Sequence, residues 1–269
     1  MTNDKQQMTN PVAEAFTRKS VVYDAFGENH DNLTRMRQKV YDHIGAFHKS
    51  DSFLLELNAG TGLDASQMVA RGYRVHATDL SSGMVAEAKE KVSRLGLEGQ
   101  LSVQQCSFTE LDQVTVGPFD GIYSNFGGLN CIEDLTAVTR HLPTLLKSGG
   151  VVSWVIMPPI CPWELSLIVK DVRVATRRLR RGGIVANVEG VQFKTSYFSV
   201  NQVRRAFGSR FHQVRLEALS LLTPTADNKT FAQNHPTLYQ TLVKLDDTLS
   251  QWPLFNRWGD FFILSMRFE

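Results

Sequence analysis

Residues 53–62 read FLLELNAGTG, and residues 73–79 read YRVHATD. The first segment is an apolar run of strand length that contains Glu56 and ends in a turn of small residues, and a helical pattern begins at about Leu63. The second segment is a short apolar run that ends in Asp79. Such a strand–turn–helix–strand unit brings a backbone turn and an acidic side chain to one edge of a parallel sheet, where open α/β sheets bind nucleotide-like ligands.

The turn is suited to close contact with a ligand. Gly60 and Gly62 lack a Cβ, so the main chain can approach a bound molecule without steric hindrance. Asp79 follows Gly60 by 19 residues, close to the roughly 20-residue spacing at which an acid can hydrogen-bond a ribose. The sequence therefore predicts a site for an adenosine-containing small molecule.

The composition limits the possible classes of protein. A chain of 269 residues with 42% hydrophobic content can bury a substantial core. Its 29 basic residues are balanced by 27 acidic ones, so net charge gives no reason to expect a nucleic-acid partner. Cys106, Cys131 and Cys161 form no CxxC pair or ligand quartet, so we expect neither a disulfide framework nor a bound metal. We also expect a cytoplasmic protein without a membrane span, because residues 1–10 lack a signal-peptide core and no apolar run reaches about 20 residues.

The apolar runs divide the chain into segments. We expect a disordered tail at 1–10, an N-terminal helical lid at 11–50, a cofactor-binding α/β core at 51–157, a cap insertion at 158–198, and the C-terminal part of the core at 199–269 with an inserted helical segment at 224–259. Short apolar strands alternate with helical segments in the core, which predicts a doubly wound, mostly parallel sheet. Continuous helices are expected over residues 132–146 and 163–181.

Two adenosine ligands fit the glycine turn. Residues 60–65 read GTGLDA, which fits the GxGxxA variant of the dinucleotide turn and keeps NAD open. Glu56 lies at the ligand end of the strand before the turn, where a carboxylate would repel a pyrophosphate. The same carboxylate would suit an ammonium or sulfonium group, and an adenosine that carries such a charge is S-adenosylmethionine.

Several motifs carry a resemblance to a known family. Residues 55–62 (LELNAGTG) resemble the first motif of the class I S-adenosylmethionine-dependent methyltransferases of small-molecule type, in which an acid precedes a GxGxG turn. Residues 77–81 (ATDLS) resemble the segment whose acid binds both ribose hydroxyls, and residues 106–108 (CSF) fall where the family contacts adenine. Residues 119–130 (FDGIYSNFGGLN) resemble the fourth-strand motif that lines the methyl-transfer cleft, and residues 145–150 (LLKSGG) the turn before strand five.

The resemblance implies a fold, a cofactor and its contacts. The fold would be a seven-stranded, mostly parallel Rossmann-like sheet with a helical N-terminal lid and cap insertions, and the cofactor would be S-adenosyl-L-methionine, with S-adenosyl-L-homocysteine as product. Asn58 stands where the family has the first glycine of the turn, and Ser107 stands where it often has an acid. The positions that match the family's cofactor contacts are Tyr23, Glu56, Asn58, Ala59, Gly60, Gly62, Asp79, Leu80, Met84, Cys106, Ser107, Phe108, Ser124, Asn125 and Phe126.

The expected reaction is methyl transfer to a small-molecule acceptor by in-line displacement. Because the sulfonium already activates the methyl group, much of the catalysis can come from holding the two reactants in line. A general base is needed only if the acceptor must lose a proton, and the polar candidates are Tyr23, His30, Asn130 and Glu164. An NAD-dependent oxidoreductase and a non-catalytic S-adenosylmethionine-binding protein remain as alternatives. No nucleic-acid partner is expected, and the oligomeric state is open.

One further segment is unusual. Residues 170–181 contain six basic side chains spread over more than one helical face, which is typical of a solvated surface. The alternative interpretation is a contact for an acidic substrate or a lipid headgroup.

Overall fold

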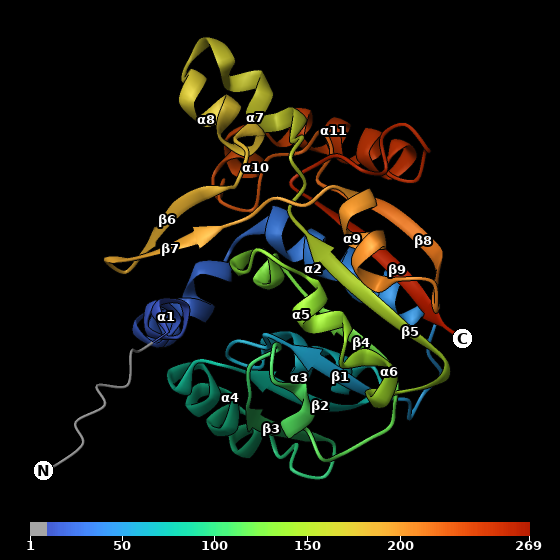
Figure 1. Ribbon diagram of the computed structural model, residues 1–269. Coiled ribbons are helices and arrows are strands. Elements are labelled where there is room, and N and C mark those ends of the chain that lie inside the picture. The colour runs from blue at the N-terminus through green and yellow to red at the C-terminus, as the bar shows by residue number, and fades with distance from the viewer. Residues whose placement is uncertain (1–9) are drawn as a thin grey trace, which may run out of the picture.

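The computed structural model describes residues 10–269, so the tail expected at 1–10 lies, apart from Asn10, outside the described residues. At its centre is a seven-stranded sheet in the order β3-β2-β1-β4-β5-β9-β8 (Figure 1). Neighbouring strands from β3 to β5 run parallel, whereas β9 is antiparallel to both β5 and β8. The predicted doubly wound, mostly parallel sheet is therefore confirmed. Its strands are β1 (Phe53–Leu57), β2 (Arg74–Asp79), β3 (Leu101–Gln105), β4 (Phe119–Ser124), β5 (Leu146–Ile156), β8 (Phe211–Leu219) and β9 (Phe261–Phe268).

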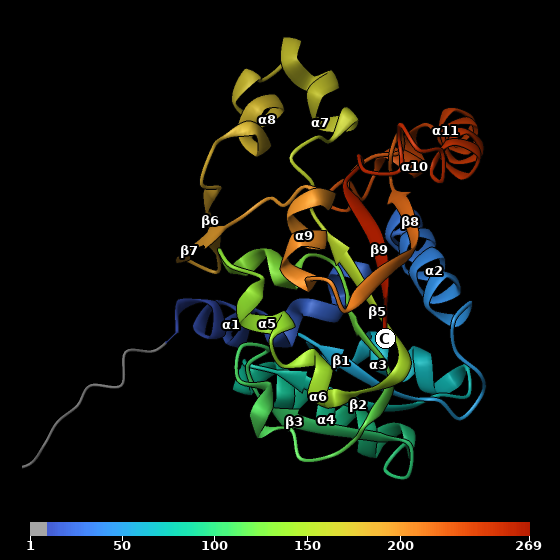
Figure 2. The same ribbon diagram turned by 45° about the vertical axis from the view of Figure 1, so that its right-hand side comes forward.

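Helices cover both faces of the sheet, and a helical N-terminal part precedes it, as predicted (Figures 1 and 2). The N-terminal helices are α1 (Pro11–Gly27) and α2 (Asp31–Gly45), and the crossover elements are α3 (Leu63–Ala70), α4 (Ser82–Leu95), η1 (Leu111–Gln113), η2 (Gly128–Cys131), α5 (Thr136–Thr139) and α6 (Leu142–Leu145). Helix α9 (Val200–Phe207) leads into β8, and α10 (Phe231–Asn234) and α11 (Pro236–Leu249) lie between β8 and β9. Among residues 10–269, no helix combines the length and the hydrophobicity that crossing a bilayer requires.

Successive side chains of a strand point to opposite faces of the sheet, so the apolar residues form one cluster on each face. Leu55 and Trp154 belong to one cluster, and Leu54 and Val155 belong to the other. All four side chains are completely buried, as expected for strands in a sheet covered on both faces. This packing holds the carboxyl ends of β1, β2 and β4 side by side, which is where the predicted site residues lie.

Two expected helices are wrong. The helix expected over 132–146 is divided into α5 and α6, because Pro143 cannot donate a backbone hydrogen bond and its ring disturbs the preceding turn. The helix expected over 163–181 is a series of short turns: α7 (Pro162–Ser166), η3 (Leu167–Val169), α8 (Val172–Thr176) and η4 (Arg177–Leu179). The Asp171 carboxylate accepts the N–H groups of Arg173 and Val174, so it starts a new helix in the middle of the segment.

These turns form a cap that is joined to the C-terminal part of the chain. They project away from the sheet in both views, and the hairpin of β6 (Ile184–Val188) and β7 (Val191–Thr195) extends from them towards α1 (Figures 1 and 2). Arg178 donates to Glu164 Oε1 and to Asp260 Oδ1, both at 2.6 Å. Ligand-type atoms of Cys161, Glu164 and Asp260 lie within 4.8 Å of one another. The guanidinium between the two carboxylates supplies the positive charge that a metal would bring, so this cluster is an ion-pair network that fastens the cap.

Candidate functional site

The glycine turn after β1 adopts the backbone that its residues favour. Gly60 and Gly62 have φ values of 57° and 73°, in the left-handed region, and Asn58 joins them at 49°. A Cβ on Gly60 would lie 3.8 Å from the Tyr23 ring and 3.9 Å from Met84 Sδ. The turn therefore passes between helix α1, which carries Tyr23, and helix α4, which carries Met84.

Asp79, at the end of β2, is held against this turn. Its Oδ2 accepts the N–H of Gly60 and its Oδ1 accepts the N–H of Ser81, each at 2.8 Å. Burial raises the pKa of Asp79, and these backbone donors oppose the rise. The turn is also joined to β2 at Ala59, whose N–H donates to Thr78 O at 2.9 Å. The carboxylate is fixed at the turn, with further lone pairs available for a ligand.

Glu56 lies beside this carboxylate on β1. Glu56 is 1% exposed. In the sheet register it is paired with Ala77 of β2 and with Tyr123 of β4. The Tyr123 hydroxyl donates to Glu56 Oε2 at 3.1 Å. Burial first, and then the negative charge of Asp64, raise the pKa of Glu56 well above its ordinary value, and Asp79 adds to the rise. Glu56 and Asp79 are therefore close enough for their charges to interact, and a positively charged ligand beside them would favour the ionised form of both groups.

Arg37 is a residue of this site that the sequence analysis missed. It donates to Asp64, which also accepts the Tyr41 hydroxyl, and its guanidinium lies 5.0 Å from the centre of the Phe126 ring. Its positive charge acts on Glu56 and on Tyr23. One signal in the sequence could have revealed it: Arg37 follows Met36 on the apolar stripe of an amphipathic helix, where a charged side chain needs a buried partner.

Helix α1 is fastened over the turn by polar contacts. Thr61 Oγ1 donates to Asp24 Oδ1 at 2.5 Å, and Lys91 Nζ donates to Asp24 Oδ2 at 2.6 Å and to Thr61 O at 2.9 Å. Burial raises the pKa of Tyr23 to about 12. Tyr23 is therefore a neutral phenol at physiological pH, able to donate a hydrogen bond but unsuited to act as a base.

The ends of β1 and β4 are joined through side-chain amides. Ser124 Oγ donates to Asn58 Oδ1 at 2.5 Å, and Asn58 Nδ2 donates to Asn125 O at 3.2 Å. The Asn125 side chain is 5% exposed, and neither Nδ2 nor Oδ1 has a partner among the described residues. Phe126, next in the chain, has a φ of 46°, an unusual conformation for a bulky residue. Buried amides are normally satisfied, so an unpaired amide beside a strained residue points to a missing ligand.

Residues 106–108 lie beside the end of β2. The backbone N–H of Cys106 donates to Asp79 O at 2.9 Å, which places this segment next to Asp79 and the following Leu80. The Cys106 thiol donates to backbone carbonyls, and Ser107 Oγ is paired with Thr109 Oγ1 at 2.8 Å. Phe108 packs against an apolar cluster of the core. The backbone of this segment, rather than its thiol or hydroxyl, is therefore left for a ligand.

His30 and Asn130 are corrected as candidate bases. His30 is 1% exposed: its Nδ1 accepts the Leu33 N–H at 3.3 Å and caps α2, and its Nε2 lies 2.7 Å from Ala226 O. Asn130 is completely buried, and its amide bonds to the backbone of Met157 and Ser196. Both side chains are used to hold loops in place, so neither is free to take a proton from an acceptor.

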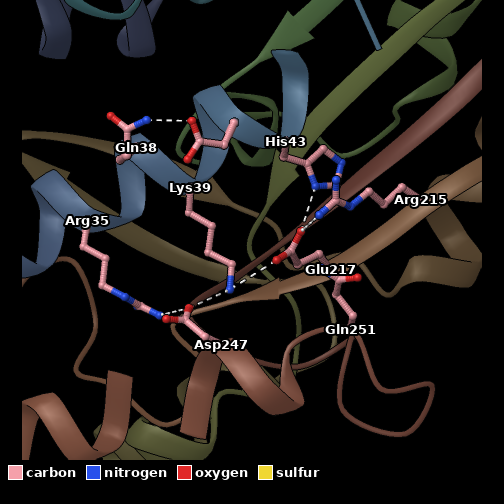
Figure 3. Close-up of a pocket in the computed structure, with 9 residues that line it drawn as sticks. Arg35, Gln38, Lys39, His43, Arg215, Glu217, Asp247 and Gln251 are labelled. Carbon is pink, nitrogen blue, oxygen red and sulfur yellow. Dashed lines mark hydrogen bonds and ion pairs between the residues drawn. The ribbon is translucent and has the colours of Figure 1, made fainter. Parts of the chain in front are cut away.

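A pocket of about 550 Å³ lies between α2, β8 and α11, away from the glycine turn (Figure 3). His43 Nδ1 is 3.0 Å from Glu217 Oε2 and His43 Nε2 is 2.9 Å from Ser265 Oγ, an order of groups that also occurs in serine hydrolases. Ser265 is completely buried and His43 is 1% exposed, so no substrate carbonyl can reach the serine. Lys39 and Arg215 pair with Glu217. The network is self-contained and stabilises the contact of α2 with β8 and β9.

Part of the chain is similar to known proteins. Residues 54–150 match the family model described as a methyltransferase domain. Over 100 residues the chain is 28% identical to the tRNA 5-carboxymethoxyuridine methyltransferase of Escherichia coli K12, a match that covers 37% of this chain and 38% of that protein. The chain thus spans well under half the length of this relative.

Solved structures share the fold. A methyltransferase from Mesorhizobium loti that depends on S-adenosylmethionine superposes with a TM-score of 0.55 at 18% identity, covering 84% of this chain and 96% of that one. The 1,6-didemethyltoxoflavin-N1-methyltransferase of Burkholderia thailandensis, solved with 1,6-didemethyltoxoflavin and S-adenosylhomocysteine, gives 0.57 at 14% identity over 96% and 87%. Residues 54–150 are therefore similar to a methyltransferase domain, and the chain shares the fold of these solved S-adenosylmethionine-dependent methyltransferases.

Proposed function

We propose that the protein transfers the methyl group of S-adenosylmethionine to a small-molecule acceptor by in-line displacement. The observation that carries the proposal is the proximity of the buried carboxylates of Glu56 and Asp79 beside the glycine turn. Two desolvated carboxylates close together favour a nucleoside with a positive charge, and they disfavour the negative pyrophosphate of NAD.

Each part of the cofactor has residues suited to it. In this proposal Asp79 binds the ribose hydroxyls, Arg37 binds the methionine carboxylate, and Glu56 balances the positive charges of the cofactor. Tyr23 and Met84 line the turn that the nucleoside contacts. The remaining proposed contacts are the glycine turn at 58–62, Leu80, the backbone of 106–108, and residues 124–126, whose unpaired Asn125 amide would gain a partner.

The cofactor supplies an activated methyl group, and the chain supplies orientation. Tyr23, His30 and Asn130 do not offer a base at neutral pH, because the first keeps its proton and the other two are bonded to the backbone. We infer that the acceptor brings its own nucleophile, such as an amine lone pair or a readily ionised oxygen or sulfur. Catalysis would then depend on alignment and on exclusion of water.

Aromatic side chains near the carboxyl edge of the sheet favour a small apolar acceptor. Phe126 meets Phe261 edge-on with ring centres 5.7 Å apart, and Trp163 of the cap meets Phe231 of α10 at 5.0 Å. Phe126 follows the carboxyl end of β4 and Trp163 follows that of β5, and aromatic rings at this edge of the sheet suit contact with a compact organic molecule. The free thiols of the three cysteines are compatible with the reducing cytoplasm that we propose as its compartment.

A tRNA acceptor is the alternative that the Escherichia coli relative raises. That relative matches only 37% of this chain, and the family model matches residues 54–150, where the cofactor motifs lie. The similarity therefore says little about the acceptor, and the formal net charge of +2 gives no separate support for RNA.

Calorimetric titration tests the cofactor half of the proposal. We expect S-adenosylmethionine to bind and NAD not to bind, and Asp79→Ala to weaken binding about 30-fold or more through loss of two charge-assisted hydrogen bonds. Glu56→Ala should weaken it as well, and unaltered affinity in both variants would refute the assignment. For the acceptor, cell extract is incubated with methyl-labelled cofactor, and label is expected in the small-molecule fraction. Label confined to RNA would replace the proposed acceptor class.

A further inference from the structure

The basic run at 170–181 is divided into two sets by the structure. Arg177 and Arg178 turn inwards and pair with Glu164, so they do not contribute to a free basic surface. The outward set consists of Lys170, Arg173, Arg180 and Arg181, all of them exposed. The exposed positive charge of this segment therefore comes from these four side chains.

Exposed aliphatic side chains lie among these cations. Val169 is 93% exposed, and Ile168, Val172 and Leu179 are each more than half exposed. Single exposed apolar residues are ordinary, but four within residues 168–179 on one short segment are not. Figures 1 and 2 show that this segment, the turns around α7 and α8, projects from the molecule away from the sheet. We name residues 168–181 the cap tip.

We propose that the cap tip docks on an anionic lipid bilayer. A bilayer offers an apolar layer for the aliphatic side chains directly beneath a layer of phosphates for the basic ones, which matches the interleaving of Val169 and Val172 with Lys170 and Arg173. A protruding tip reaches a flat surface more readily than a recessed one. The contact is reversible, because the apolar set is small and the electrostatic part is screened by salt.

RNA fits the cap tip less well than lipid does. Proteins bind single-stranded nucleic acid largely by stacking bases on aromatic rings, and residues 168–181 contain no aromatic side chain. Trp163, the nearest aromatic residue before the tip, is packed against Phe231. Four exposed aliphatic side chains would gain nothing from a phosphate backbone, whereas they gain from burial in acyl chains.

Docking of the cap tip would also orient the proposed cofactor site relative to the bilayer. Arg178 joins the cap to Asp260, directly before β9, so the tip is fixed to the sheet rather than carried on a free loop. The cap also follows the carboxyl end of β5, the same edge at which the cofactor site lies. Docking would therefore turn this edge towards the bilayer. Binding of the cap tip to a bilayer does not depend on the identity of the methyl acceptor.

Vesicle flotation tests the inference. The full chain is mixed with vesicles of phosphatidylcholine, or of phosphatidylcholine with about one-third phosphatidylglycerol, at low salt. We expect flotation with the anionic vesicles only, and release at about 0.5 M salt. The variant Val169→Asp with Val172→Asp, and the variant Arg180→Glu with Arg181→Glu, should each reduce the bound fraction at least ~10-fold.

A matched control separates the cap tip from basic charge in general. Arg204→Glu with Arg205→Glu makes the same charge change at an exposed pair on α9 and should leave flotation unchanged. Melting temperature and cofactor affinity, measured for every variant, should match the parent. Failure to float, equal flotation with neutral vesicles, or an equal loss in the α9 control would overturn the proposal. Tip variants that lose binding to bulk tRNA, with no vesicle binding in the parent, would assign the surface to RNA instead.

Discussion

Glu56 occupies a place where a carboxylate is stable only beside a positive charge. It is almost completely buried, Asp64 and Asp79 both oppose its ionisation, and Arg37 favours it only partly. The sequence indicated that Glu56 needs a positive charge nearby, because an acid ahead of a glycine turn suits a cationic ligand. It did not reveal Arg37, whose role depends on how helix α2 is rotated against the sheet. Tertiary packing determines that rotation, and the local sequence pattern does not.

Glu56→Gln should separate stability from function. Because burial and Asp64 raise the pKa of Glu56, the folded protein holds the proton more tightly than the unfolded chain does. The folded state therefore loses stability as the pH rises from the ordinary pKa of a glutamate through the raised one, and the loss is complete above it. Without cofactor, the glutamine variant should melt at a higher temperature than the parent at pH 8, and the difference should vanish as the pH falls towards the ordinary value.

The same substitution should weaken the cofactor at least ~10-fold, because glutamine cannot balance a positive charge. Thermal unfolding across the pH range and titration at pH 8 measure the two effects. The tyrosine contact is preserved, since the glutamine carbonyl can still accept from Tyr123. A variant that melts below the parent at pH 8 would contradict this account of Glu56.

At the scale of elements, short runs and turn residues predicted the sheet better than they predicted the helices. Strand β4 is marked locally by a short run of buried residues, and helix α9 by a capping box at Ser199. The helices expected at 132–146 and 163–181 were wrong, since a proline and a capping aspartate interrupt them. What the cap contacts could not be predicted, because Arg178 and Asp260 lie 82 residues apart in the chain.

Arg178 should be required for a stable cap. It is 5% exposed and lies between two carboxylates, so Arg178→Met leaves Asp260 buried without its ion-pair partner and leaves Glu164 paired with Arg177 alone. Breaking such a group costs about 3–5 kcal/mol, or roughly 6–20 °C in melting temperature for a chain of this size. Arg173→Met, at an exposed position on the same cap, is the matched control and should change the melting temperature by about 1–2 °C at most. Equal melting of the two variants would show that the ion pairs contribute little.

At the scale of the whole molecule, the proposed site joins parts of the chain that are distant in sequence. Tyr23 and Arg37 come from the N-terminal helices, Glu56 and Asp79 from β1 and β2, and Asn125 follows β4. The sequence predicted the strand contributions, because the order of strands fixes which carboxyl ends meet. The contribution of α2 is a property of the assembled fold, and a ligand that spans all these parts should stabilise the molecule as a unit.

S-adenosylhomocysteine at 100 times its Kd should stabilise the folded protein by about 2.7 kcal/mol, which corresponds to a rise of roughly 5–10 °C in melting temperature. Methylthioadenosine lacks the amino-acid carboxylate, so at the same concentration it should give a smaller rise. If Arg37 binds that carboxylate, Arg37→Met should lose about 10- to 100-fold in affinity for S-adenosylhomocysteine and little for methylthioadenosine. The ratio of the two affinities is the informative quantity, because any loss of stability from leaving Asp64 unpaired affects both ligands alike. A variant that weakens both ligands equally would remove Arg37 from the methionine end of the site while leaving the roles proposed for Asp79 and Glu56 intact.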